Sequence, residues 1–192
     1  MIEVAASSPA SEIAHALHAL VNAWRAQASS DLPHRLVMGS GTNVFTVVSK
    51  LRALRLLTAA LADQCERPQP LIRVRVHVSE LRAQDASTAL VRQTVEALAG
   101  VLGLADELEI APLADGEDSS WRALAVGHVL REESGLASVA DPAAGSHWVE
   151  HTTATLSRDA WALFQRLEGG DELPAEPFSA SKIIVGITDF VS

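Results

Sequence analysis

An α/β fold with a parallel sheet is the fold class that this sequence predicts, and three observations lead to it. Short segments of alternating apolar and polar residues recur along the chain, and segments with apolar residues at helical spacing separate them. The resulting order of strand, helix, strand and helix is typical of parallel strands joined by right-handed crossovers. With 192 residues, 48% of them hydrophobic and 20% charged, the chain is long enough to bury a substantial core. We therefore expect a single domain over residues 1–192.

The first part of the chain is predicted to supply two helices and one strand. Residues 1–10 include several small residues, and we expect them to be a flexible lead-in. Apolar residues at helical spacing predict a helix from Pro9 to Arg25 and another from Asn43 to Gln64. Between the two helices, Arg35 to Ser40 is predicted to be extended, with Gly41 as the turn that follows.

The segment from Leu71 to Ser79 carries the strongest strand signal, because apolar and polar residues alternate from its second residue onward. One face of this strand holds β-branched residues, which are suited to packing under helices. The other face is polar and cationic, and it holds Arg73, Arg75, His77 and Ser79. Such a face is suited to a polar pocket that receives an anion.

The remaining elements continue the same rhythm of helices and strands, with a loop before the last helix. They are a helix from Asp85 to Leu102, a strand from Glu107 to Ala111, a helix from Ser119 to Glu133, a brief extended piece from His147 to Glu150, a helix from Thr152 to Glu168, and an apolar tail from Ile183 to Ile187 that is a short strand or a docked segment.

Charge and cysteine content exclude several kinds of partner and compartment. The net charge of -9 and the pI near 5.2 argue against a nucleic-acid partner, which would require a basic surface. The single cysteine, Cys65, forms no internal disulfide, so we expect a reducing compartment. The sequence shows no cationic leader at its start and no apolar run of membrane-spanning length. We therefore expect a cytoplasmic protein without a membrane partner.

Side-chain parity brings charged residues of three predicted strands to one side of the sheet. They are Arg35 from the first strand, Arg73, Arg75, His77 and Ser79 from the second, and Glu107 and Glu109 from the third. If these faces converge, the arginines can bind an anionic group, and His77 can donate or accept a proton. Alternatively, Arg73 or Arg75 pairs with Glu107 or Glu109, and the charges neutralise each other without any ligand.

Motifs of several enzyme classes do not occur in this sequence, and we expect no metal site. There is no Gly-x-Ser-x-Gly elbow, Walker A loop, Gly-x-Gly-x-x-Gly turn or His-Glu-x-x-His helix. His15 and His18 share the first predicted helix without a third ligand in register. His147 and His151 are predicted to lie across a loop boundary, not on one helix, and the acidic turn around Gly116 is expected to be solvated.

Several stretches of the chain, in the same order, are similar to segments of one known family. They are Arg35 with Ser49 to Leu57, Arg73 to His77, Val91 to Ala99, and, most specifically, Leu130 to Ser134 with Val139 to Glu150. These segments resemble the C-terminal part of the catalytic (β/α)8 barrel in the methylmalonyl-CoA mutase family. The resemblance extends over nearly the whole chain from about Glu12.

The resemblance implies a partial TIM-type barrel of about three to four parallel β/α units, with a helical N-terminal extension and a short C-terminal extension. A closed barrel of this type usually needs about 250 residues. An open parallel sheet exposes hydrogen-bonding edges that another chain or a second copy must cover. We therefore expect an obligate oligomer, and we favour a heteromer over a homo-oligomer.

The resemblance transfers only part of the family's site to this chain. Arg35 and His77 match positions that contact the CoA ester in the family. The chain departs from the family pattern at Pro70, Ser79, Asp106, Ala111 and Asp115, and the Asp-x-His-x-x-Gly motif of the cobalamin-binding domain does not occur in it. The resemblance thus implies no radical rearrangement by this chain alone, and adenosylcobalamin only through a partner.

Three functions remain open from the sequence. The first is a repurposed mutase-like subunit of a heteromeric biosynthetic enzyme, which binds a small anionic metabolite and catalyses a non-radical elimination or cyclisation. In this hypothesis His77 is catalytic, and the substrate-binding residues are Arg35, Arg73, Arg75, Ser79 and Glu109. The second is an auxiliary or split subunit of an adenosylcobalamin-dependent acyl-CoA mutase, which is an isomerase. The third is a non-catalytic structural or regulatory partner whose arginines and glutamates only pair with each other.

Overall fold

A computed structural model of the chain describes residues 1–4, 8–26, 32–41, 43–76, 86–114 and 116–171. Its strands are all parallel and form one sheet in the order β1-β2-β3-β4. The strands are β1 (Ile2–Val4), β2 (Arg35–Gly39), β3 (Leu71–Val76) and β4 (Glu107–Ile110). The predicted α/β class with a parallel sheet is confirmed, and strands that alternate with helices in an open sheet are consistent with a partial barrel.

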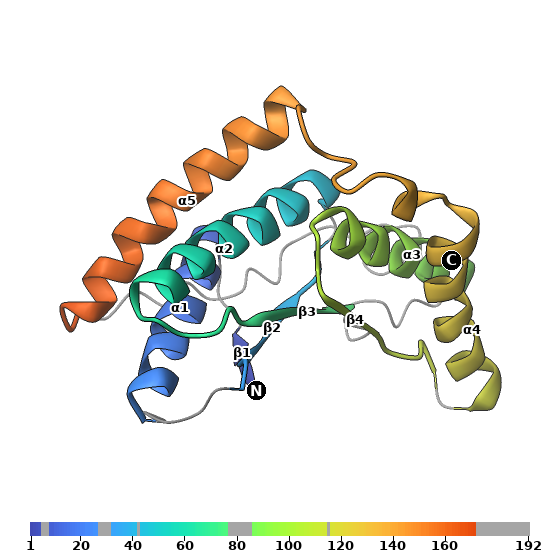
Figure 1. The fold of residues 1–192 in the computed structure, drawn as a ribbon. Coiled ribbons are helices and arrows are strands. Elements are labelled where there is room, and N and C mark those ends of the chain that lie inside the picture. Colours follow the sequence, from blue (N-terminus) through green and yellow to red (C-terminus); the bar gives the residue numbers. More distant parts are fainter. Residues whose placement is uncertain (5–7, 27–31, 42, 77–85, 115, 172–192) are drawn as a thin grey trace.

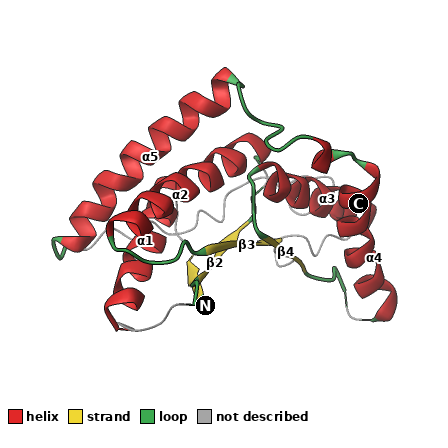
Figure 2. Cartoon of the chain, in the orientation of Figure 1, coloured by secondary structure: helices red, strands yellow, loops and turns green. Residues whose placement is uncertain are grey.

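A helix follows each strand, and one more helix completes the described chain. The helices are α1 (Pro9–Ala26), α2 (Val44–Gln64), α3 (Ala86–Leu102), α4 (Glu117–His128), which continues into a π-helical turn (Val129–Glu133), a short 3₁₀ turn (Leu136–Ser138), and α5 (His147–Glu168). Figures 1 and 2 show α1, α2 and α3 on one face of the sheet, and α5 lying across the outer side of α1 and α2. The opposite face of the sheet carries none of the described helices.

Strand register decides which side chains lie beneath the helices. Met38 of β2 pairs with Val74 of β3, and Val74 pairs with Leu108 of β4. Met38 and Val74 are fully buried, as are Leu36 and Val76. Because side chains alternate along a strand, the arginines and glutamates of β2, β3 and β4 lie on the opposite face, away from the helices.

The largest part of the core lies where α1, α2 and α5 pack on each other and on the sheet. Leu17 of α1 and Leu51 and Leu54 of α2 are fully buried there, with Phe164 of α5 beside them. Each large aliphatic side chain buried in this way contributes roughly 1.5–3 kcal/mol to folding. Helix α2 starts at Asn43, whose side chain accepts a hydrogen bond of 3.2 Å from the Thr46 backbone and so caps the helix.

A buried ion pair joins α1, α2 and the end of β2. Lys50 Nζ lies 2.9 Å from Glu12 Oε2 and donates a second hydrogen bond of 2.8 Å to the Gly39 carbonyl. Lys50 is only 5% exposed, so its charge depends on these two partners. No local sequence pattern indicates this interaction, because Lys50 and Glu12 are 38 residues apart.

The structure corrects three local predictions. Residues 1–10 are not simply a flexible lead-in, because Ile2–Val4 form β1 and pair with β2 in parallel. The extended piece predicted at His147 to Glu150 is the first turn of α5. The helix predicted to reach Glu133 changes to π-helical geometry after His128. A three-residue strand and an uncapped helix start give weak sequence signals, which explains the first two errors.

Gly103, which directly follows the last residue of α3, also has a steric role. A Cβ atom at this position would lie 2.5 Å from Cδ1 of Leu51, so α3 can approach α2 this closely only with glycine there. The left-handed residue after α3 is Leu104, with φ of 62°. The apolar tail predicted at 183–187 lies outside the described residues.

No helix in the described part of the chain is both long and apolar enough to cross a membrane.

Candidate functional site

The helix-free face of the sheet carries a connected set of arginines and glutamates, which we call the Arg/Glu ladder. Arg73 lies between the two glutamates, with Nε 2.6 Å from Glu107 Oε2 and Nη1 3.2 Å from Glu109 Oε2. Arg75 Nε lies 2.9 Å from Glu109 Oε1, and Arg35 Nη2 lies 2.9 Å from Glu107 Oε1. Two carboxylates therefore hold three guanidinium groups from neighbouring strands, and this set carries a formal excess of one positive charge.

The register of the strands explains why these side chains meet. Arg73 pairs directly with Glu107 across β3 and β4, and Arg75 pairs directly with Glu109. Arg35 begins β2, one strand further away, and its long side chain reaches past β3 to Glu107. Opposite charges placed on adjacent parallel strands with the same parity form such pairs readily.

The arginines stabilise the charged form of both glutamates. Hydrogen bonds from Arg35 and then from Arg73 lower the pKa of the Glu107 carboxyl, and partial burial opposes this effect. The hydrogen bond from Arg75 lowers the pKa of Glu109 in the same way. The hydrogen bond to Glu107 raises the pKa of Arg73. Both glutamates are therefore ionised at neutral pH, and neither has the raised pKa expected of a general acid.

One donor and one open space remain beside the ladder. The Nε atom of Arg35 is buried and has no hydrogen-bond partner in the part of the chain that the structure describes. Gly39 stands at the other end of β2 from Arg35, and no described atom lies within 4 Å of where its Cβ would be. The Arg35 Nε is thus a buried donor without a partner among the described residues, and the space at Gly39 is a separate feature of the same face.

The structure brings four of the six predicted site residues together. Arg35, Arg73, Arg75 and Glu109 all belong to the Arg/Glu ladder. His77 and Ser79, the predicted catalytic residue and one predicted ligand, lie outside the described residues. The alternative prediction was that arginines of β3 pair with glutamates of β4. The distances between Arg73 and Glu107 and between Arg75 and Glu109 confirm this pairing.

Sequence reasoning left Glu107 out of the predicted site, although it holds two arginines. The sequence does contain a signal for Glu107: it lies two residues before Glu109 on the same strand, and so on the same face of the sheet. Buried polar residues near the carboxyl ends of the strands were also missed. Gln93 of α3 donates a hydrogen bond of 2.6 Å to the Ala111 carbonyl, and Ser40 donates one to Glu96. These side chains fix α3 against the ends of β2 and β4, where parallel α/β proteins place their sites.

No group of three or more potential metal ligands gathers within the described residues. The sequence-based expectation that the acidic turn near Gly116 holds no cation stays a prediction, since Asp115 lies outside the described part. His15 and His18 both have protein partners: the Ser11 carbonyl for His15, and Glu168 and Asn22 for His18.

Comparisons with known proteins agree with the resemblance seen in the sequence. A family model described as methylmalonyl-CoA mutase matches residues 3–171. The methylmalonyl-CoA mutase of Cereibacter sphaeroides is 33% identical over 138 residues, which are 67% of this chain and 20% of that protein. The large subunit from Propionibacterium freudenreichii subsp. shermanii is 36% identical over 140 residues, 68% of this chain and 19% of that protein.

A small subunit of the same enzyme name is also similar. The methylmalonyl-CoA mutase small subunit of Streptomyces virginiae is 34% identical over 136 residues, which are 66% of this chain and 22% of the subunit. The chain thus spans about a fifth of the length of these relatives. With a family model matched over most of its length and a sheet of the expected kind, this chain belongs to the methylmalonyl-CoA mutase family.

Proposed function

We propose that this chain is an auxiliary or split subunit of a mutase-like enzyme, in which it supplies part of the barrel wall. The remaining strands would come from polypeptide outside these 192 residues. The observation that carries this proposal is the open sheet: β1 and β4 each pair on one side only within the described residues. Eight parallel strands close such a barrel, and unpaired edges of a parallel sheet need a neighbour.

The free edge of β4 adjoins an apolar groove that supports this proposal. The groove has a volume of about 890 Å³ and lies between β4, the end of α3 and α4. Its lining includes Leu108 and Ile110 of β4, Leu124 of α4, Leu130 of the π-helical turn, and Val139. Leu124 is 64% exposed and Val139 is 60% exposed. Apolar lining beside an open strand edge suits a further strand whose alternate side chains are apolar.

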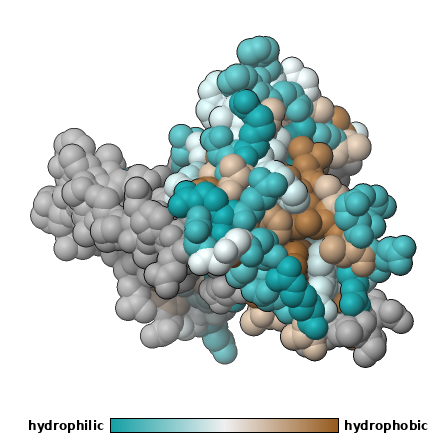
Figure 3. All heavy atoms as spheres, turned by 90° about the vertical axis from the view of Figure 1, so that its left-hand side faces the viewer, coloured by the Kyte–Doolittle hydropathy of each residue, from teal (hydrophilic) through white to brown (hydrophobic). Residues whose placement is uncertain are grey.

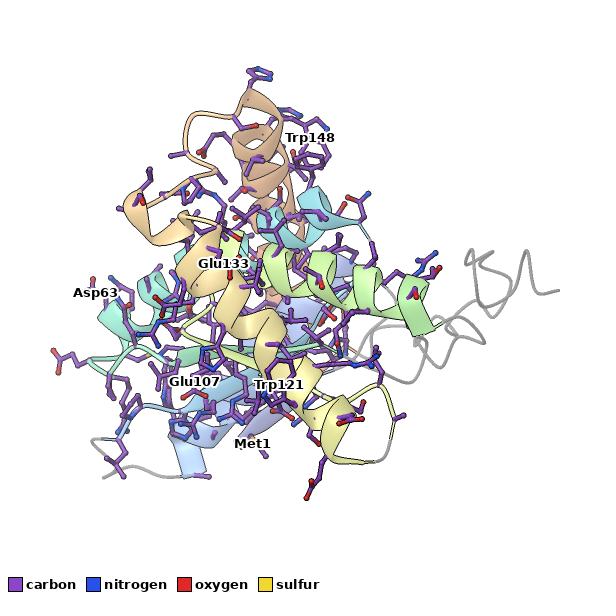
Figure 4. All side chains as sticks on the ribbon, turned by 90° about the vertical axis from the view of Figure 1, so that its right-hand side faces the viewer. Met1, Asp63, Glu107, Trp121, Glu133 and Trp148 are labelled. Atoms are coloured by element: carbon purple, nitrogen blue, oxygen red, sulfur yellow. The ribbon has the colours of Figure 1, made fainter. Side chains whose placement is uncertain are left out.

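The outer face of α4 extends this apolar surface. A second groove of about 360 Å³ is lined by Trp121, Leu124, His128 and Val129, with Glu132 and Glu133 at one end. Trp121 is 70% exposed, and Figure 4 looks directly onto this helix, with Trp121 and Glu133 labelled along it. The lining of this groove includes two carboxylates and no Lys or Arg. Arg131 pairs with Glu132, and Glu133 has no ion-pair partner among the described residues, so a helix with a basic residue at its flank is the partner element that the groove fits.

The two-chain arrangement also has support among relatives. Proteins of Streptomyces virginiae that resemble this chain are named as large and small subunits of methylmalonyl-CoA mutase. We propose by extension that this chain works beside a different polypeptide rather than alone.

This proposal assigns the cobalamin cofactor to the partner, because residues at which the chain departs from the family pattern have other partners within this chain. Asp106, which stands at a position where the chain departs from the family, accepts hydrogen bonds of 2.7 Å from the Ile72 backbone and 2.8 Å from Arg55. Its side chain is thereby used to fix β3 and α2 to the start of β4. The carbonyl of Ala111, another such position, is used by Gln93.

The experiment isolates the tagged chain from the cells that produce it under mild conditions. Mass spectrometry of the bound chains, the absorbance spectrum of the complex and mutase activity on methylmalonyl-CoA are then measured. The proposal expects a mutase-family partner and corrinoid absorbance. A colourless, inactive complex, or a chain that elutes alone, would overturn it.

A photo-crosslinking residue tests the partner surface directly. Placed at Leu124, it should join a partner segment with apolar residues at helical spacing and flanking Lys or Arg. Leu56 of α2 is similarly exposed, at 59%, and serves as the matched control position. Equal crosslinking from both positions would contradict the role of α4.

The anionic-metabolite hypothesis is the second candidate. The excess positive charge of the Arg/Glu ladder favours it, as does the buried Arg35 Nε, which has no hydrogen-bond partner among the described residues. In this version His77 moves a proton, and the metabolite is bound by Arg35, Arg73, Arg75, Ser79 and Glu109. Turnover by the isolated complex should fall sharply after Arg35→Ala and after His77→Ala. Arg131→Ala, which removes an exposed pair with Glu132, is the control. Unchanged turnover in both site variants would exclude this candidate.

A further inference from the structure

The first turns of α5 place two histidines on one helix face, contrary to the sequence-based prediction of a loop boundary between them. His147 is the first residue of α5, and His151 follows one turn later. The two imidazole rings are parallel within 1°, and their centres are 6.3 Å apart. Both side chains are exposed. Because both histidines lie on one helix, their side chains can approach the same ion.

The ring nitrogens of this pair are not used by the protein. Neither His147 nor His151 has a hydrogen-bond partner in the described part of the chain, whereas His15 and His18 are both engaged. Free imidazole nitrogens on successive helical turns are the arrangement that binds zinc in helical two-histidine motifs. The segment His147-Trp148-Val149-Glu150-His151 has the His-x-x-Glu-His spacing of such a motif.

We propose that His147 and His151 form a binding site for a late first-row divalent cation, with Cu²⁺ bound more tightly than Zn²⁺. Imidazole is a good ligand for both ions, and the order of affinity follows the general ranking of these metals. Two protein ligands leave further positions for water or for a donor from a partner. This inference does not depend on the proposed function.

The geometry needs only a small adjustment to hold an ion. A tetrahedral ion with metal–nitrogen distances of about 2.0–2.1 Å places two ring centres roughly 5 Å apart. The observed spacing is 6.3 Å, and rotation of two exposed side chains can close the difference.

Glu150 does not act as a third ligand in this arrangement. Its Oε1 lies 2.8 Å from Arg52 Nη2 and accepts a hydrogen bond of 3.4 Å from the Gly145 backbone. Arg52 also binds Asp141, so this cluster fixes the loop before α5 to α2. The carboxylate thereby steadies the start of the helix that carries both histidines, and we assign it no role as a catalytic base.

The experiment titrates the full chain, prepared without a histidine tag, with CuCl₂ and with ZnCl₂ by calorimetry. We expect one ion per chain and a nitrogen-coordinated Cu²⁺ signal in electron paramagnetic resonance. Loss of an outer-sphere partner lowers metal affinity roughly 10- to 100-fold. His147→Gln and His151→Gln each remove a direct ligand, so each should weaken Cu²⁺ binding by more than this.

The control is His128→Gln, which removes a lone exposed histidine of α4 and should leave the titration unchanged. Circular dichroism checks that each variant keeps its helices. If the two α5 variants bind Cu²⁺ as the unmodified chain does, the titration reports an adventitious ion only, and the proposal is overturned. The absence of Cu²⁺ binding by the unmodified chain would also overturn it.

Discussion

The two sides of the helical layer differ in how completely they are buried. Around α2, the helices α1 and α5 pack on both sides, and one large cluster of buried residues joins them to the sheet. Figure 3 looks onto the side of α1 and α5, where the surface is mostly hydrophilic with a narrower hydrophobic strip. Around α4 the cluster is small, and it consists of Val76, Ala97, Val126 and Leu130. Trp121 and Leu124 of this helix stay exposed.

The packing around α2 is thus mostly supplied by the described chain itself, although Phe45 and Leu56 of α2 are exposed, and the packing around α4 is supplied to a smaller extent. Helix α2 lies in the middle of the described helices, while α4 lies beside the free edge of β4 (Figure 1). Incomplete burial coincides with the open edge of the sheet. Four substitutions or conditions test this contrast between α2 and α4.

Removal of the buried Lys50 tests the packing around α2. Lys50→Met leaves the Glu12 carboxylate buried without a partner, and we expect a loss of about 3–5 kcal/mol in the free energy of unfolding. The double variant Lys50→Met with Glu12→Leu should recover most of that loss, because an apolar pair needs no compensation. Urea denaturation measures both. A single-variant loss below about 1 kcal/mol would show that water reaches this pair.

A side chain at position 103 tests the contact between the end of α3 and α2. Gly103→Ala places a methyl group 2.5 Å from Leu51 Cδ1, and such overpacking usually costs about 1–3 kcal/mol. Gly127→Ala in α4 is the matched control, since its nearest neighbour, Ile110 Cδ1, lies 3.9 Å away. Alanine has the higher helix propensity, so this control should be neutral or stabilising. Equal destabilisation in both would refute the steric role of Gly103.

Lowering the pH tests how much the Arg/Glu ladder contributes to stability. The pKa values of Glu107 and Glu109 are lowered by arginine partners, so their contribution to stability is complete above the ordinary glutamate value of 4.5. It is lost as the pH falls below that value through the folded-state pKa. Thermal unfolding between pH 7 and pH 3 should show this loss, and Glu107→Gln should reduce its steepness. An identical pH profile in the variant would contradict the pairing.

A charge on the exposed face of α4 should have the smallest effect on the isolated chain. Leu124→Asp and the matched Leu56→Asp should each change stability by no more than about 0.5 kcal/mol, as surface substitutions usually do. Chemical denaturation of the purified chain measures this. If Leu124→Asp alone is strongly destabilising, α4 is covered by this chain itself, and the contrast between the two sides fails.

Most of the fold could be predicted from the sequence because its periodicities are strong. The alternation in Leu71–Val76 and the apolar stripe of α2 specify a strand and a helix regardless of their neighbours. Weak local signals caused the errors. Strand β1 has only three residues, and α5 begins at a histidine with no capping hydrogen bond from the preceding Ser146 side chain.

The candidate site was predictable only in part. Parity placed Arg35, Arg73, Arg75 and Glu109 on one face, and this placement depends on the alternation of side chains alone. The pairing pattern was not fixed by parity, because it also depends on register: Glu107 meets Arg73 since these two residues lie opposite each other. His77 and Ser79 stay predictions.

The class of the fold, the order of its elements and the family of the chain could all be inferred without coordinates. These follow from hydrophobic period and from local residue patterns, which act over a few residues at a time. Only the tertiary structure decided which charges neutralise each other, that Lys50 is buried against Glu12, and that α4 keeps an apolar face in solvent. Those outcomes depend on distances between residues far apart in the chain, and no local pattern contains them.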